Sequence, residues 1–218
     1  MNQPNVHEYD TDRKQANLDR ELARIALTAL GFSNIQDTPK SQDIIGVDFT
    51  CDRAVRNQPR SFKVEHKARQ GGVYVPRYLQ NAAPDKDGLL PWAEDLVLET
   101  WSDIKAGYPG WTLDGQKISD LVIWTWQGKP GEDAGFIMLP YKPLREALQA
   151  NLKTWRAKYR VEQQTSRKQR NGRLYEYQSE TIKVPIRVLL VAIKDAASFN
   201  ADLYTLCGWA GKQAALGI

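Results

Sequence analysis

Two segments of the chain alternate between apolar and polar residues, which predicts two neighbouring β-strands. Residues 44–51 read IIGVDFTC and residues 61–68 read SFKVEHKA, and successive residues of a strand point to opposite faces of a sheet. The residues between them, DRAVRNQPR, include turn formers, so we expect a hairpin. If its strands pair with their apolar faces together, Asp48, Glu65 and Lys67 share the opposite face.

Apolar spacing elsewhere predicts helices at residues 14–30, where Gly31 follows, and at residues 143–158. Further strands are expected at residues 95–101, 118–126, 135–140 and 182–193, and a weaker helix at 196–206. Residues 1–13 are polar, and we expect them to be flexible. The chain, residues 1–218, is therefore expected to form a single α/β domain with a mixed central β-sheet flanked by helices.

Composition places the chain among ordinary globular proteins, with 42% apolar and 26% charged residues. No run approaches the ~20 apolar residues that a membrane span needs, and the first residues lack an apolar signal core. Cys51 and Cys207 are far apart in sequence, which argues against a disulfide framework and a cysteine-based zinc site. We therefore expect a soluble, cytoplasmic protein without a membrane partner.

Positive charge is concentrated in one segment. Residues 153–173 contain eight Lys or Arg and one acidic residue, whereas the net charge of the whole chain is only +4. We expect a basic insertion or hairpin at residues 156–180 that contacts a polyanion, although a merely solvated basic hairpin is the simpler alternative. The residues expected to hold a nucleic-acid backbone are Arg167, Lys168, Arg170 and Arg173.

The predicted polar face of the hairpin carries two carboxylates and one ammonium group. Neighbouring carboxylates raise each other's pKa unless a cation separates them, and Mg²⁺ typically takes one or two carboxylates together with substrate phosphates. A nearby lysine can orient or deprotonate a water or offset charge that develops on the phosphate. Asp48, Glu65 and Lys67 are therefore candidate catalytic residues for phosphodiester hydrolysis, and a solvent-facing strand with an incidental ion pair is the alternative.

These residues resemble the core of the PD-(D/E)XK nuclease superfamily, in which an acid on one strand precedes Asp/Glu-x-Lys on the next. Asp48 and then Glu65-His66-Lys67 fit that pattern, with Val47 where the family name has proline. Other Asp/Glu-x-Lys triplets in the chain, at residues 12–14 and 103–105, lack the strand context. The resemblance covers roughly residues 14–127 and implies a restriction-endonuclease-like core, a Mg²⁺ or Mn²⁺ cofactor and nuclease activity.

The resemblance also implies further ligands and roles. Asp48 and Glu65 would bind the metal together with the backbone carbonyl of His66, and Glu21 on the preceding helix would join them.

Gln70, which follows the strand, could contact phosphate or water. Glu99 and Asp120 are weaker candidates, for a water-bridged role and for a functional or structural carboxylate respectively.

The function expected from these residues is that of a metal-dependent DNA endonuclease. Nucleases that cut both strands often act as dimers, so DNA and a second copy of the chain are the expected partners. The alternative is a catalytically inactive nuclease fold that serves as a DNA-binding or protein-interaction module. A third reading is a component of a larger assembly, whose basic segment docks on an acidic protein.

Overall fold

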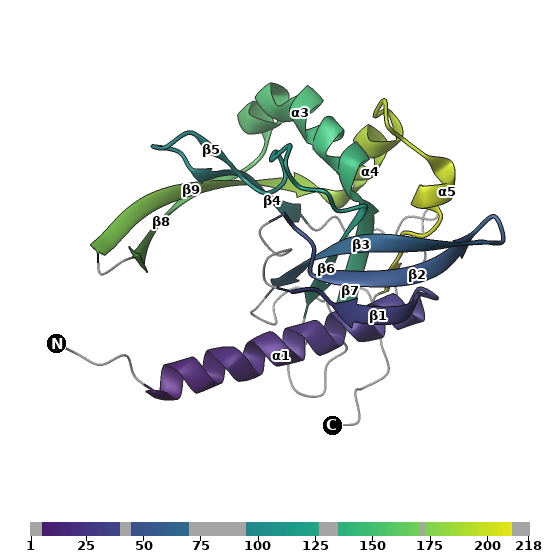
Figure 1. Ribbon diagram of the computed structural model, residues 1–218. Coiled ribbons are helices and arrows are strands. Elements are labelled where there is room, and N and C mark those ends of the chain that lie inside the picture. The colour runs from purple at the N-terminus through teal and green to yellow at the C-terminus, as the bar shows by residue number, and fades with distance from the viewer. Residues whose placement is uncertain (1–5, 40–44, 70–94, 127–134, 171–172, 211–218) are drawn as a thin grey trace, which may run out of the picture.

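The computed structural model describes residues 6–39, 45–69, 95–126, 135–170 and 173–210 and has a mixed α/β architecture (Figure 1). A six-stranded sheet forms its centre. The β3 and β6 strands are parallel and the other neighbours are antiparallel, so the sheet is mixed, as expected. In spatial order its strands are β1 (Ser33–Asp37), β2 (Phe49–Val55), β3 (Gln58–Arg69), β6 (Leu121–Trp126), β7 (Gly135–Pro140) and β10 (Trp209–Ala210).

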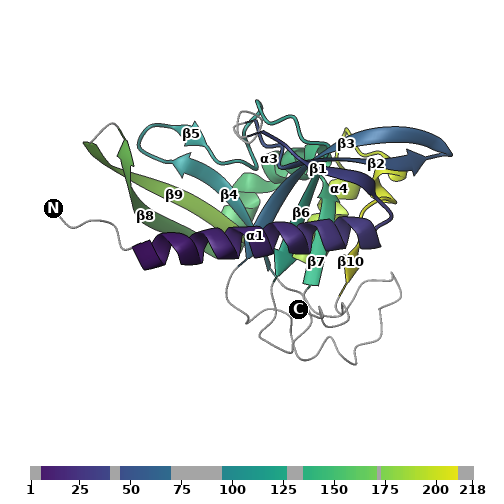
Figure 2. The same ribbon diagram turned by 60° about the horizontal axis from the view of Figure 1, so that its bottom comes forward.

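One face of this sheet is covered by the helix α1 (Val6–Ala29), which runs across the strands (Figures 1 and 2). Ala23, Ala26 and Leu27 are buried at helical spacing and pack with Phe49, Val64 and other apolar residues of the sheet. The predicted helix is therefore confirmed, and Gly31 follows its end with a φ of 81°. It begins at Val6, however, so part of the segment expected to be flexible is helical. A packed helix can extend through polar residues because each added residue gains a backbone hydrogen bond.

The other face of the central sheet packs against two helices and a second sheet. Val122 and Trp124 of β6 lie in this second core with residues of the helices α3 (Tyr141–Lys158) and α4 (Ile186–Lys194). The second sheet is antiparallel, with the order β5 (Tyr108–Pro109), β4 (Asp95–Asp103), β9 (Arg173–Pro185) and β8 (Val161–Arg170). A short helix, α5 (Ala201–Tyr204), follows α4.

The hairpin predicted for residues 44–68 is formed by β2 and β3. Phe49 pairs with Val64 and the pairing continues to Val55 and Gln58, so the strands are longer at the turn than expected. Arg56 and Asn57 make the turn, with φ values of 50° and 62°. Two central residues with positive φ are typical of the type I′ turn that suits a two-residue hairpin.

Three expected elements differ from the structure: only residues 49–51 of the strand expected at 44–51 lie in β2, only Ala201–Tyr204 of the helix expected at 196–206 is helical, and the strand expected at 182–193 is mostly wrong. Residues 182–193 were expected to form a strand, but β9 ends at Pro185 and the rest of the segment is the helix α4. Ile186, Leu189, Leu190 and Ile193 are buried and recur at helical spacing. The apolar run was too continuous for its period to be evident, and Pro185 marks the boundary because it stands just before the first helical residue.

The basic segment lies mostly on the second sheet. Its residues 161–170 form β8 and Arg173 begins β9, and the two strands pair as an antiparallel hairpin from Val161–Ile182 to Arg170–Arg173. Within the described part of the chain, no helix is both long and apolar enough to cross a membrane.

Candidate active site

The β2–β3 hairpin brings Asp48 and Glu65 next to each other. Asp48 immediately precedes β2, whose first residue, Phe49, pairs with Val64, the residue before Glu65 on β3. The backbone N–H of Asp48 donates to the carbonyl of Val64 at 2.9 Å. Asp48 and Glu65 therefore both lie at the open end of the hairpin, away from its turn at Arg56 and Asn57.

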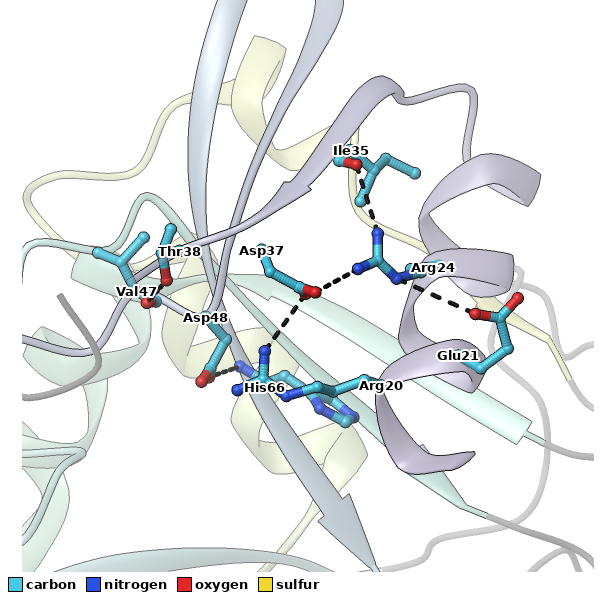
Figure 3. Close-up of polar contacts among 9 residues, drawn as sticks. All are labelled: Arg20, Glu21, Arg24, Ile35, Asp37, Thr38, Val47, Asp48 and His66. Carbon is cyan, nitrogen blue, oxygen red and sulfur yellow. Dashed lines mark hydrogen bonds and ion pairs between the residues drawn. The ribbon is translucent and has the colours of Figure 1, made fainter. Parts of the chain in front are cut away.

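The Asp48 carboxylate lies along the edge of β3. Its Oδ2 accepts a hydrogen bond from the backbone N–H of His66 at 2.7 Å (Figure 3). The N–H and C=O of one strand residue point to the same side, so the His66 carbonyl faces the edge where the Asp48 carboxylate lies. Asp48 and this carbonyl can therefore offer oxygen ligands to one ion.

Glu65 is a buried carboxylate with one unsatisfied oxygen. Its residue is 2% exposed, and its Oε1 forms an ion pair with Nζ of Lys67. Its Oε2 is buried and has no hydrogen-bond partner among the described residues. A buried, unpaired carboxylate oxygen carries a large desolvation cost, and a cation bound there would remove that cost.

Gly46 closes the site on the Oε2 side. Its φ is 81°, and a Cβ atom at this position would lie 2.1 Å from Oε2 of Glu65. The backbone therefore approaches the carboxylate more closely than any side chain would allow. The side chain of Lys117 packs at the same place, since its Cδ would lie 2.7 Å from a Cβ atom on Gly46.

Lys67 is held between Glu65 and an aromatic ring. It lies on the same strand face as Glu65, its side chain is 27% exposed, and its Nζ lies 4.9 Å from the centre of the Trp111 ring. The backbone of Trp111 is fixed in turn, because its N–H donates to Oε2 of Glu99 at 3.0 Å and its carbonyl accepts from the hydroxyl of Tyr141. Glu99 thus reaches the site only through Trp111.

Tyr141 is a neutral donor in this arrangement. Burial and the negative charge of Glu65 raise the pKa of its hydroxyl above the ordinary value. Sequence reasoning missed Trp111 and Tyr141 because they come from distant segments whose apolar character indicates only core packing.

The side chain of His66 lies on the opposite face of β3, as its place in the alternation predicted. It packs against Phe49 and its Nε2 is 2.8 Å from Oγ1 of Thr125. Burial, followed by the charges of Lys67 and Arg20, lowers its pKa to about 4. The imidazole is therefore neutral at pH 7, and only the backbone of His66 faces Asp48.

Glu21 is not brought to Glu65. It lies on α1, which covers the other face of the sheet, and its side chain is 58% exposed with Arg24 Nε 4.0 Å away. Arg24 and Arg20 instead both bind Asp37, at 2.5 Å and 3.2 Å (Figure 3). Asp37 lies beside the start of β2, where it pairs with Phe49. Sequence reasoning missed this cluster because β1 is short and mostly exposed.

Asp120 holds two strands together. Its Oδ2 accepts from the backbone N–H of Lys63 at 2.9 Å, and its own N–H donates to the Lys63 carbonyl at 2.8 Å. These bonds fix the residue that precedes β6 against β3, which agrees with the structural alternative for this residue.

The predicted nucleic-acid residues lie apart from the carboxylates. Arg167 on β8 forms an ion pair with Glu176 on β9 at 3.3 Å. The backbones of Lys168, Arg170 and Arg173 lie at the end of the β8–β9 hairpin. Gln70 is outside the described residues.

The donor set fits a hard divalent ion of the Mg²⁺ type. It consists of oxygens from Asp48, Glu65 and the His66 carbonyl, and Mg²⁺ commonly uses one or two carboxylates with waters and substrate completing its shell. Among the described residues there is no group of three or more His, Cys, Asp or Glu side chains that could hold a metal. Waters and substrate oxygens would complete the shell of an ion held by these oxygens.

Comparison with known protein families, with curated proteins and with solved structures finds no match to this chain.

Proposed function

We propose that the protein is a DNA endonuclease that hydrolyses phosphodiester bonds with the help of Mg²⁺ or Mn²⁺, on a restriction-endonuclease-like core of the PD-(D/E)XK type. The observation that carries this proposal is the state of Glu65. One oxygen of this buried carboxylate is paired with Lys67, the other has no partner among the described residues, and the Asp48 carboxylate binds the backbone N–H of the next residue, His66. Metal-assisted phosphate hydrolysis uses carboxylate oxygens as ligands of the ion and can use an adjacent ammonium group near the phosphate.

The residues have separate roles in the proposed reaction. Asp48, Glu65 and the His66 carbonyl would hold the ion. When bound, the ion supplies Lewis-acid stabilisation of the phosphate and a more acidic bound water. Lys67, which contacts Glu65 and the Trp111 ring, would orient the attacking water and offset negative charge on the phosphate.

Plasmid cleavage in Mg²⁺ or Mn²⁺ tests the catalytic role of Lys67. We expect the wild-type protein to convert supercoiled DNA to nicked or linear DNA, and Lys67→Ala to be slower by about 10²-fold or more, the range of a positioned proton-transfer group. Lys63→Ala is the matched control, because Lys63 is an exposed residue on the same face of β3. Equal rates for Lys67→Ala and the wild type would remove Lys67 from the mechanism.

Calorimetry with the divalent ion tests the metal site without any cleavage. We expect Mg²⁺ or Mn²⁺ to bind the wild-type protein and not Asp48→Asn or Glu65→Gln, since each variant replaces one carboxylate by an amide. Ion binding without cleavage of any DNA would instead favour the inactive nuclease fold as a binding module. The absence of ion binding in the wild type would reject the proposed site.

A further inference from the structure

The β8–β9 hairpin extends beyond the rest of the second sheet. The pairing of β4 with β9 reaches Trp101 and Glu180, and the last backbone bond between the two segments joins Ile104 to the Gln178 carbonyl at 2.8 Å. The pairs from Ser166–Tyr177 to Arg170–Arg173 have no third strand beside them among the described residues. These five pairs, here called the arm, span roughly 17 Å and project from the body in Figures 1 and 2.

The register divides the arm into two faces of opposite character. Facing residues share a face and successive residues alternate. One face, here called the paired face, has Arg167 opposite Glu176, and this ion pair neutralises both charges. The other face, here called the basic face, carries Ser166, Lys168, Arg170, Arg173, Tyr175 and Tyr177.

The basic face has three cationic residues and no carboxylate. The register sets Arg170 directly opposite Arg173, and like charges at facing positions destabilise a strand pair. Tyr175 is 49% exposed although it is a large aromatic residue. A bound polyanion would offset the repulsion between the facing arginines, and it would also cover the exposed tyrosine.

The basic face also leads toward the candidate active site. Alternation along β9 continues it through Ser179 to Thr181, and Thr181 pairs with Glu99 of β4. The Glu99 carboxylate accepts a hydrogen bond from the backbone N–H of Trp111, and the ring of Trp111 lies beside Lys67. A substrate that follows this face of the second sheet from the arm would therefore approach the region of Lys67.

We propose that the basic face of the arm binds duplex DNA, with the ribbon along the major groove and Lys168, Arg170 and Arg173 at the phosphates. A two-stranded β-ribbon fits the ~12 Å width of that groove, and contacts to phosphate position a protein on DNA without reading its sequence. This inference rests on the proposed function, because the choice of DNA as the bound polyanion comes from it. Arg167 is excluded from this contact, because it lies on the paired face.

The salt dependence of binding tests the arm separately from cleavage. Binding of a fluorescent 20-base-pair duplex is measured by anisotropy in EDTA at several salt concentrations for the wild type and for Lys168→Ala/Arg170→Ala/Arg173→Ala. Each lost phosphate contact makes the slope of log affinity against log salt shallower by about 0.9. We expect a change of about 2.7 in the triple variant, so that between 50 and 200 mM salt the wild type loses about 40-fold more affinity than the variant.

The matched control is Arg167→Ala/Glu176→Ala, which removes the ion pair of the paired face from the same strands. Its slope should equal that of the wild type, and circular dichroism should show that both variants fold. An unchanged slope in the triple variant, or an equal change in the control, would overturn the proposal. Tighter binding of the single strand than of the duplex would overturn its duplex form.

Cleavage assays keep this result apart from the proposed function. If the triple variant binds DNA like the wild type while cleavage still requires Lys67, the arm proposal fails and the nuclease proposal stands. If the arm variant loses affinity but the wild type cleaves no DNA with Mg²⁺ or Mn²⁺, the arm proposal stands and the nuclease proposal fails.

Discussion

At the scale of single residues, the burial of Glu65 explains the composition of its strand. A glutamate two places from a lysine contributes little on an exposed strand, since such pairs are worth about 0–1 kcal/mol. Glu65 is not exposed, and its carboxylate forms an ion pair with Lys67. The ion pair with this ammonium partly compensates the cost of burying the carboxylate.

Gly46→Ala should disturb this carboxylate directly. A methyl group there would meet Glu65 Oε2 at 2.1 Å in a backbone with φ of 81°. The left-handed backbone alone costs alanine about 1–2 kcal/mol, and overpacking adds about 1–3 kcal/mol. We expect a loss of unfolding free energy of that combined size in urea denaturation, together with weaker divalent-ion binding by calorimetry.

Gly107→Ala is the matched control for backbone strain. Gly107 has a φ of 71°, but a Cβ there meets nothing within 4 Å, so only the cost of the left-handed backbone applies. Equal losses of stability in the two variants, with ion binding intact in both, would contradict the close approach of Gly46 to Glu65.

At the scale of elements, prediction succeeded where the apolar period was clear. The alternation in residues 61–68 placed Glu65 and Lys67 on one face, and the observed register agrees. It failed at α4, where the run IRVLLVAI is apolar at most positions, so neither period stands out. The strand β1 was not predicted, because its residues are mostly exposed and its pairing with β2 leaves no local period. The strand β8 was expected only as part of a basic insertion or hairpin at residues 156–180, because its residues are mostly polar.

The helical assignment of α4 can be tested by two substitutions. Leu189 is fully buried and Val191 is 59% exposed, although both would lie on the same face of a strand. We expect Leu189→Ala to lower the unfolding free energy by about 2–5 kcal/mol, as is usual for buried leucines. Val191→Ala should change it by about 0.5 kcal/mol or less, as is usual at the surface. Similar losses for both, measured by urea denaturation, would favour the strand.

At the scale of the whole molecule, the site depends on the way in which three layers meet. The helix α1 covers one face of the central sheet, and α3, α4 and the second sheet cover the other. Lys67 and Trp111 meet at the second of these junctions. The alternation along β3 predicts that Glu65 and Lys67 share a face. It does not predict that Trp111, in the loop before β6, contacts Lys67, or that Tyr141, at the start of α3, binds Trp111. Such contacts depend on the chain's long-range packing, which has no local period.

The second sheet is held to α3 by a buried carboxylate, Glu180, which is 1% exposed. Its oxygens accept from Thr100 at 2.7 Å, Arg156 at 2.9 Å and Gln163 at 3.2 Å. Arg156→Met removes the cationic partner of Glu180 and should cost about 2–3 kcal/mol, the upper range for a hydrogen bond to a charged group. Arg167→Met breaks the exposed pair with Glu176 and should cost about 1 kcal/mol or less.

A double variant separates loss of the ion pair from loss of packing at this junction. Glu180→Gln keeps an oxygen for Thr100 but removes the buried charge, so Arg156→Met/Glu180→Gln should be more stable than Arg156→Met alone. Unfolding free energies from urea denaturation give the comparison. If the double variant loses the full sum of the single losses, Glu180 and Arg156 act independently, and the junction between α3 and the second sheet is held by its apolar contacts instead.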